Sequence, residues 1–524
     1  MKPPYAPPKN TRPGTIKYVS KTTPKPPPVV GFVSLGCPKN LVDSEVMMGL
    51  LDRAGARLTP RPEDAEILVV NTCSFIDTAR QESVDTILEM ARHKTSGSAQ
   101  KLIVAGCLVE RYRDEIRKSI PEVDAVIGTS ELESILEAAG IVPTPAAPSP
   151  FNILTGNGHG EIRPGREAEA GTHKSAARAE GDAREQQGRF SRDRWQGAAH
   201  LLPTYLYDET TPRLLTTPRT SAYVKIAEGC DHPCSFCVIP NLRGKFRSRR
   251  FESVVAEAQQ LVARGVEEIT LIGQDTTCYG EDLGIKDGLA HLLDALAAIE
   301  GLRWLRFLYA YPNRITGRLL DTIARHRNIC KYLDVPLQHA SPAVLKRMKR
   351  GAGADIFLKT IEKVRAAVPG IVLRTSFIVG FPGESPDDLR ILEDFISAAQ
   401  FDWLGVFSYS DEEGSGAHAL DAKVPRRTIE SRRRRLMKLQ QSISRRSKQN
   451  WIGRELTLLA EGESEETPLL WEGRTEFHAP EIDGKVYIND FGNLPSLEPG
   501  RFYRARITEA HDYDVVAGIV SGPF

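Results

Sequence analysis

The sequence lacks any long uninterrupted apolar run, and its 524 residues carry a formal net charge of only +1. A membrane-spanning helix needs about 18 or more predominantly apolar residues, so we expect no membrane span. Residues 1–28 are rich in proline and lysine and contain no apolar core of a signal peptide, which predicts a disordered tail on a cytoplasmic protein. Since bulk charge is absent, any charged partner must be recognised by a local patch.

The sequence also lacks the Ser/His/Asp and paired-carboxylate arrangements that are typical of hydrolases. Cysteine is scarce, with eight residues in the whole chain. In a long chain without a secretion signal, patterned cysteines indicate metal binding or catalysis before disulfides. Six of the eight fall into two groups of three, while Cys278 and Cys330 stand alone and are expected to be ordinary core or loop residues.

Three short apolar runs lie near the start of the chain, and each is followed by a segment with helical periodicity. Runs rich in valine, isoleucine and leucine are typical of parallel strands that are buried on both faces. With a weaker fourth strand, they predict a parallel-sheet α/β domain over residues 29–142. The expected strands span residues 29–35, 66–71, 101–105 and 125–127.

Residues 143–218 are dominated by Gly, Ala, Arg, Glu and Pro, and most of them lack apolar periodicity. This composition predicts a long, largely disordered linker. Over residues 219–450, six strand-like runs alternate with helical patterns, which favours a partial (βα)6 barrel, two units short of an eightfold barrel. The expected strands span residues 222–227, 268–272, 304–308, 332–335, 372–379 and 404–407.

Residues 451–524 contain short alternating segments separated by Gly, Pro and Asn, a pattern that predicts a small β-barrel. Residues 453–524 hold fourteen Asp and Glu against six Lys and Arg. A module that binds nucleic acid would be expected to carry a basic face, whereas this acidic balance suits a basic protein surface. An acidic surface that is merely solvated is the alternative.

The first group of cysteines consists of three residues that each follow an expected strand, Cys37, Cys73 and Cys107. Parallel strands place their carboxyl ends at one edge of a sheet, so these thiols should converge where open α/β sheets bind ligands. Three buried core cysteines are the alternative. Three thiolates complete neither a Cys₄ zinc site nor an all-cysteine cluster site, but they suit a 4Fe–4S cluster with one open iron.

The second group has the spacing Cys-x₃-Cys-x₂-Cys and consists of Cys230, Cys234 and Cys237, just after the first expected barrel strand. One loop with this spacing can wrap three corners of a cubane cluster. A zinc site with His232 as the fourth ligand is the alternative, although zinc sites more often use paired Cys-x₂-Cys units. The place at the carboxyl end of a barrel strand favours an active site.

This spacing, with an aromatic residue before the third cysteine, resembles the radical S-adenosylmethionine (AdoMet) superfamily. Together with the N-terminal three-cysteine domain and a C-terminal barrel similar to a TRAM domain, the chain resembles the methylthiotransferase family. Longer strings resemble the branch of that family that modifies ribosomal protein S-twelve; they span residues 34–40, 71–77, 229–234, 334–340 and 374–384. The resemblance covers all of the chain except the tail and the linker.

The resemblance implies an enzyme that adds a methylthio group to the β-carbon of an aspartate in ribosomal protein S-twelve, with AdoMet as radical source and methyl donor. It implies two 4Fe–4S clusters and no catalytic residues beyond their ligands. The auxiliary cluster, which carries or delivers the sulfur, is assigned to Cys37, Cys73 and Cys107. The AdoMet-cleaving cluster is assigned to Cys230, Cys234 and Cys237.

The family pattern suggests that Phe236 packs against the adenine of AdoMet. Gly380 and Gly383 are expected to form a tight turn near the cofactor. Gln274, just past the second barrel strand, is placed to hydrogen-bond AdoMet, although a loop residue without such a role fits nearly as well.

Two other functions stay open at this point: methylthiolation of adenosine in tRNA, and a non-catalytic iron–sulfur carrier that would fail to cleave AdoMet. The expected partners are S-twelve, free or in the small subunit, a sulfur donor, and an electron donor such as flavodoxin or ferredoxin. A basic run after the cysteine loop, residues 243–250, could meet a substrate carboxylate or phosphate. The arginines at 432–435 are expected to be a solvated helix face.

Overall fold

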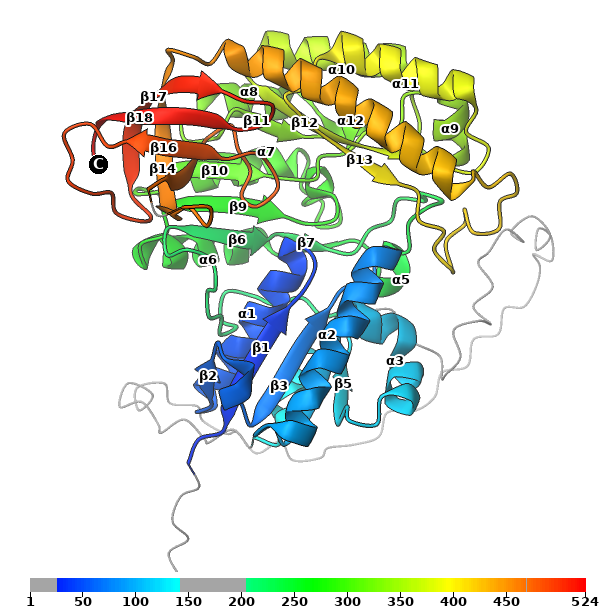
Figure 1. Cartoon of the computed structure of the whole chain (residues 1–524), viewed down its shortest axis with the longest axis vertical. Coiled ribbons are helices and arrows are strands. Elements are labelled where there is room, and N and C mark those ends of the chain that lie inside the picture. The colour runs from blue at the N-terminus through cyan, green and yellow to red at the C-terminus, as the bar shows by residue number, and fades with distance from the viewer. Residues whose placement is uncertain (1–25, 142–203, 468) are drawn as a thin grey trace, which may run out of the picture.

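The computed structural model describes residues 26–141, 204–467 and 469–524, which form three domains (Figure 1). Most of the expected tail, and the expected linker as far as residue 203, lie outside the described residues. Within the described part, no helix combines the length and apolar character needed to cross a membrane.

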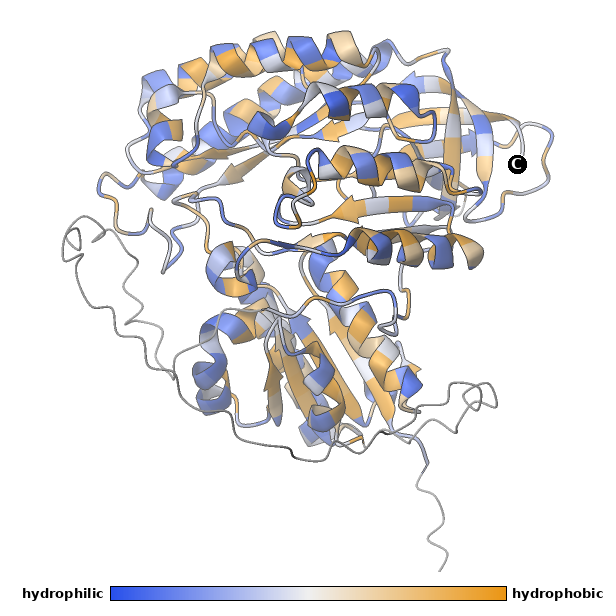
Figure 2. Cartoon of the chain, turned by 180° about the vertical axis from the view of Figure 1, so that it is seen from behind, coloured by the Kyte–Doolittle hydropathy of each residue, from blue (hydrophilic) through white to orange (hydrophobic). Residues whose placement is uncertain are grey.

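The N-terminal domain is a five-stranded parallel sheet in the order β2-β1-β3-β4-β5. Val69 and Val70 in β3 point to opposite faces and are both fully buried, because helices cover both sides. The strands are apolar along most of their length (Figure 2). The elements are β1 (Val29–Ser34), α1 (Pro38–Arg53), β2 (Arg57–Thr59), β3 (Ile67–Thr72), α2 (Asp77–Ser96), β4 (Lys101–Gly106), α3 (Cys107–Ser119), β5 (Ala125–Ile127) and α4 (Ile135–Ala139).

The central domain confirms the six expected parallel strands. They form two sheets, β6-β9-β10 and β11-β12-β13, which a single bridge between Leu305 and Ile329 joins into a partial barrel. The strands are β6 (Ser221–Lys225), β9 (Glu268–Ile272), β10 (Trp304–Phe307), β11 (Tyr332–Asp334), β12 (Val372–Val379) and β13 (Trp403–Ser408). The helices are α5 (Ile239–Arg243), α6 (Phe251–Ala263), α7 (Gly288–Ala297), α8 (Gly317–Arg325), α9 (Pro342–Arg347), α10 (Ala354–Ala367), α11 (Pro386–Ala399) and α12 (Arg426–Gln449).

The C-terminal domain is a closed five-stranded barrel in the order β14-β15-β16-β18-β17. It packs on the N-terminal ends of the central strands, where Trp304 meets Phe502 edge to face and Arg474 pairs with the buried Glu268. The acidic barrel is thereby held away from the carboxyl ends of those strands. Its strands are β14 (Glu455–Glu463), β15 (Trp471–Thr475), β16 (Val486–Asp490), β17 (Phe502–Ala510) and β18 (Val515–Ser521).

The described end of the expected linker, residues 204–218, is packed between the first two domains. Arg213 pairs with Glu45 of α1 at 2.6 Å and with Glu257 of α6 at 2.7 Å. Tyr207 is buried beside the same Glu257. This segment therefore differs from the loose linker that its composition predicts, since buried ion pairs fix it to both domains.

Candidate functional site

The three N-terminal cysteines lie at one edge of the parallel sheet, as the strand-end argument predicts. Cys37 follows β1 and precedes the first turn of α1, Cys73 follows β3, and Cys107 follows β4 as the first residue of α3. The backbone at Gly36 has a φ of +92°, and a Cβ there would lie 3.0 Å from the Sγ of Cys73. Only glycine allows this approach, so the chain can bring Cys37 beside Cys73.

The pKa values of Cys73 and Cys107 reflect both burial and the neighbouring thiols. Burial raises the pKa of Cys107 to about 12, and the thiols of Cys73 and Cys37 act in the same direction. Burial also raises the pKa of Cys73, with Cys37 again contributing. In both cases the guanidinium of Arg243, which comes from the central domain, opposes the rise. Cys73 and Cys107 therefore favour the protonated form, and a metal that binds to them must displace their protons.

The second set of cysteines is held by a loop that starts after β7 (Ala227–Glu228) and ends at α5. The amide of Cys230 donates to the carbonyl of Gly244 at 3.2 Å, and the amide of Ile239 points at the Sγ of Cys237 at 3.4 Å. Burial raises the pKa of Cys230 to about 11 and of Cys237 to about 12, and Cys234 raises both. Arg350 lies 3.6 Å from the Sγ of Cys234.

The two sets of cysteines both lie at the boundary between the first two domains. Cys107 packs in a small buried cluster with Val238 and Leu242, which directly follow the cysteine loop. Lys39 reaches from α1 to the carbonyl of Gly273 at 3.2 Å and lies 3.5 Å above the ring of Tyr309. The structure thus brings together two thiol sites that are far apart in the sequence.

Arg243 is the central residue of a buried charge network at this boundary. Its guanidinium donates to Asn40 and Asp43 of α1, each at 2.6 Å, and to Glu228 at 3.2 Å. Lys225 in β6 contacts the same carboxylates, Asp43 at 2.5 Å and Glu228 at 2.6 Å. The sequence alone does not identify these partners of Arg243. The one available signal was that Lys225 and Glu228 are charged residues within or next to an apolar strand-like segment.

The basic run at residues 243–250 could meet a substrate, but two of its members are buried and paired within the protein. Arg243 neutralises the network just described, and Arg249 is buried in an ion pair with Glu257. Similarly, Arg432 does not belong to a solvated helix face: it is buried and donates to Glu384 at 2.8 Å. Long aliphatic stems and buried carboxylates make these cations part of the interior.

The other expected cofactor contacts have the following places. Phe236 is half-buried against a small apolar cluster that includes Phe381. The amide nitrogen of Gln274 donates to Glu228 at 2.6 Å, whereas its buried oxygen has no partner among the described residues. Gly380 (φ +81°) and Gly383 (φ +77°) form a turn whose Cβ positions face Ile429 and Arg347, so packing alone already requires glycine at 380.

His232 does not join the neighbouring cysteines as a zinc ligand. Its Nε2 lies 2.6 Å from Asp275, and the Sγ of Cys278 lies 3.0 Å from the same carboxylate. His232 also stacks on Tyr311 with ring centroids 3.9 Å apart. The ligand atoms of His232, Asp275 and Cys278 fall within 4.8 Å of one another, close enough for an ion, but hydrogen bonds between them already satisfy these groups.

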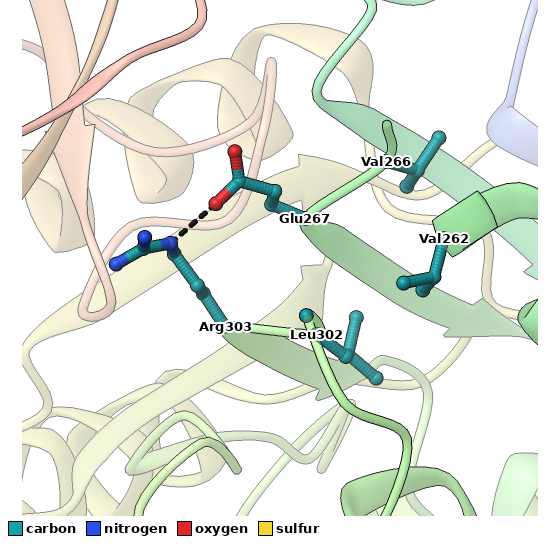
Figure 3. A pocket seen from close by; sticks show the side chains of 6 residues that line it. Val262, Val266, Glu267, Leu302 and Arg303 are labelled. Atoms are coloured by element: carbon teal, nitrogen blue, oxygen red, sulfur yellow. Dashed lines mark hydrogen bonds and ion pairs between the residues drawn. The ribbon is translucent and has the colours of Figure 1, made fainter. Parts of the chain in front are cut away.

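A surface pocket of about 400 Å³ lies elsewhere on the central domain (Figure 3). Val262, Val266 and Leu302 line it, together with the ion pair between Glu267 and Arg303. Glu267 and Arg303 precede β9 and β10, so the pocket is at the N-terminal ends of the strands. Active sites of α/β barrels lie at the opposite, carboxyl end, where the cysteine loop is.

Three family models match three separate parts of the chain. The family model described as "Uncharacterized protein family UPF0004" matches residues 29–128, "Radical SAM superfamily" matches residues 224–396, and "TRAM domain" matches residues 452–520. The radical SAM match implies a 4Fe–4S cluster and AdoMet.

Curated relatives match almost the whole chain. The chain is 66% identical over 94% of its length to "Ribosomal protein uS12 methylthiotransferase RimO" of Koribacter versatilis, covering 97% of that protein. It is 55% identical to the protein of the same name from Solibacter usitatus and 43% identical to that from Trichlorobacter lovleyi, over 94% of the chain and 95% and 98% of those proteins. The chain therefore belongs to the RimO family of radical SAM methylthiotransferases.

Proposed function

We propose that this enzyme adds a methylthio group to the β-carbon of an aspartate in ribosomal protein uS12 (S-twelve), so that a C–S bond replaces a C–H bond. The observation that carries the proposal is the pair of three-cysteine sites that lie at the boundary between the first two domains. The family supplies uS12 as the substrate, and the acidic C-terminal barrel suits a basic protein surface.

In this proposal, Cys230, Cys234 and Cys237 hold the cluster that binds AdoMet, and Cys37, Cys73 and Cys107 hold an auxiliary cluster. When bound, the clusters and AdoMet supply the 5′-deoxyadenosyl radical, the sulfur and the methyl group. Each set offers three thiols to a cluster, and each has an arginine nearby. Arg243 lies beside the N-terminal set and Arg350 beside the second set. A cluster with three thiolates keeps one iron open, whereas a simple electron carrier uses four protein ligands.

We assign further parts of the cofactor pocket to Phe236, Gln274, Gly380 and Gly383. The support is strongest for Gln274, since its amide nitrogen is committed to Glu228 while its buried oxygen is left to accept from a ligand. Glu228, held by Lys225 and Arg243, would fix the orientation of that amide. A ligand that donates to Gln274 would satisfy the unpaired oxygen.

The remaining partners follow from the chemistry. Radical formation needs one electron at a time, which a flavodoxin or ferredoxin can supply, and the auxiliary site must be reloaded by a sulfur donor. We place the reaction in the cytoplasm, where ribosomal proteins are available. We further propose residues 29–142, 219–450 and 451–524 as the functional units, joined by residues 143–218 after a tail over residues 1–28.

The test uses enzyme reconstituted anaerobically with iron and sulfide, then incubated with AdoMet, a strong reductant and either uS12 or tRNA. A gain of about 46 Da on an aspartate peptide of uS12 is expected, because a methylthio group replaces hydrogen. The same gain on tRNA alone would contradict the choice of substrate. No gain on either, with no 5′-deoxyadenosine formed, would contradict the proposed chemistry.

Cysteine variants separate the two sites. Cys230→Ala should abolish formation of 5′-deoxyadenosine, whereas Cys37→Ala should retain it but form no methylthiolated product. Each variant should bind about half the iron of the parent if each site holds one cluster of the same kind. Cys330→Ala, at a buried cysteine outside both sets, is the control and should keep the full iron content.

A further inference from the structure

The outer face of α12 is strongly basic. This helix, Arg426–Gln449, lies across the outside of the central domain and leads into the acidic barrel (Figure 1). Its inner face is anchored by Ile429, Leu436 and Ile443, all of them buried. Eight of its cations are exposed: Arg426, Arg427, Arg433, Arg434, Arg435, Lys438, Arg445 and Arg446.

Four of these cations form one straight ridge. At 100° per residue, steps of seven, four and seven residues place Arg427, Arg434, Lys438 and Arg445 within about 40° of one another around the helix axis. Their mean direction is opposite to the buried face. With a rise of 1.5 Å per residue, the ridge is about 27 Å long.

Most of the positive charge on this ridge is not neutralised by acidic side chains. Among the described residues, no ion pair is present for Arg427, Arg434 or Lys438, and Arg445 has only a contact of 3.6 Å to Asp512. Beside the ridge, Arg435 pairs closely with Glu393, and Arg433 lies 3.9 Å from Glu430. Arg434 and Lys438 are four residues apart, a like-charge spacing that destabilises a helix. Helix stability therefore does not account for the pattern.

The chemistry of the ridge fits a polyanion better than an acidic protein. A protein interface usually has an apolar or aromatic core inside its polar rim. None of the exposed large apolar side chains of the described residues lies on α12. A line of cations without apolar side chains between them matches a phosphate backbone, which is bound by charge alone.

We propose that this ridge binds the phosphate backbone of ribosomal RNA next to uS12, so that the assembled ribosomal subunit is the substrate on which the enzyme docks. This inference rests on the proposed function, because it takes uS12 as the target. The acidic barrel at the C-terminal end of α12 would repel RNA, which confines the RNA contact to the ridge. The barrel remains available for a basic protein surface.

The experiment compares two variants of the full-length enzyme that lose the same charge. The ridge variant carries Arg427→Gln, Arg434→Gln, Lys438→Gln and Arg445→Gln, since glutamine keeps helix propensity. The control variant carries the same number of substitutions at exposed cations on α3 and α10, namely Arg117→Gln, Lys118→Gln, Lys359→Gln and Lys363→Gln. Circular dichroism checks that both variants are folded.

Binding to purified small ribosomal subunits, and to their extracted RNA, is measured at several salt concentrations. The ridge variant should reduce the steepness of the negative slope of log K against log salt by about 3, because each of the four lost phosphate contacts contributes about 0.7 to 0.9. The control variant should keep the parent slope. Equal slopes and affinities for both variants would overturn the proposal, as would loss of binding to the subunit with unchanged binding to its RNA, which would indicate an acidic protein as partner.

Rates of methylthiolation, measured with free uS12 and with uS12 in the subunit, distinguish this inference from the proposed function. The ridge variant should modify free uS12 at the parent rate but modify uS12 in the subunit more slowly. If the ridge variant modified both substrates at the parent rates, the ridge would have no role in docking. If the parent enzyme modified neither, the proposed function would fail, while the binding measurements would still decide whether the ridge contacts RNA.

Discussion

Replacing Asp43 with asparagine tests whether buried charge joins the N-terminal domain to the central domain. One oxygen of Asp43 accepts from Lys225 at 2.5 Å and the other from Arg243 at 2.6 Å. The side chain is 4% exposed, so water cannot replace the lost charge. Asparagine keeps the shape of the side chain but leaves the two cations with Glu228 as their main remaining carboxylate.

Removing one partner of a buried ion pair typically costs about 3 to 5 kcal/mol. Because Glu228 still contacts both cations, we expect Asp43→Asn to cost about 3 kcal/mol, at the low end of that range. Burial lowers the pKa of Lys225, but Asp43 and Glu228 more than offset this and hold it above its usual value. The variant loses part of that support, so its deficit should be smaller at high pH, where Lys225 can lose its proton.

Hydrogen exchange of the α1 amides measures this effect without assuming that the whole chain unfolds in one step. A loss of about 3 kcal/mol corresponds to about 100-fold faster exchange. Asp52→Asn is the control, since Asp52 is exposed on the same helix and forms no ion pair within the described residues. Equal protection of α1 in the two variants would refute the reasoning.

The remaining predictions concern other buried charges. Burial lowers the pKa of His339 to about 4, so the folded protein loses stability as pH falls from 6.5 through 4, by about 3 kcal/mol in total. His339→Asn should flatten this part of the plot of unfolding free energy, measured in urea, against pH. Glu412→Gln removes the carboxylate that pairs with Arg111 between the domains and should speed proteolysis at this boundary, whereas Glu413→Gln, at an exposed position, should not. Burial lowers the pKa of Lys448 to about 8, so Lys448→Met should remove a loss of stability that develops as pH falls from about 10.5 through 8.

Sequence reasoning located the thiol sites because cysteine positions were tied to strand ends. Cys37, Cys73 and Cys107 follow three parallel strands, and parallel strands align their carboxyl ends without any knowledge of side-chain packing. The six central strands were also predictable, since each is a buried run of apolar residues. The assignment of clusters to these thiols remains a proposal, which the iron measurements test.

Other features could not be predicted because they depend on partners far away in the sequence. The strand Arg57–Thr59 is short and half-exposed at a sheet edge, and Trp471–Thr475 contains two charged residues and a glycine, so neither has the pattern of a strand. A run such as residues 243–250 looks like a solvated or ligand-binding basic segment until its carboxylate partners are known. Asp43 lies 200 residues before Arg243, and no local pattern connects them.

Buried ion pairs cross the boundary between the first two domains beside apolar contacts, and these pairs have a functional consequence. Asp43 with Arg243, and Glu412 with Arg111, each join one domain to the other with both side chains almost fully buried. Such pairs add little net stability compared with apolar packing. However, any other arrangement of the two domains that left one of these charges buried without its partner would be strongly destabilised. In the proposed function, a radical formed at one thiol site acts on a substrate that receives sulfur at the other, so the separation of the two sites must be fixed closely, since small displacements cost large factors in rate. Arg243 contributes to both requirements, because it pairs with Asp43 across the boundary and its charge reaches the thiol of Cys107.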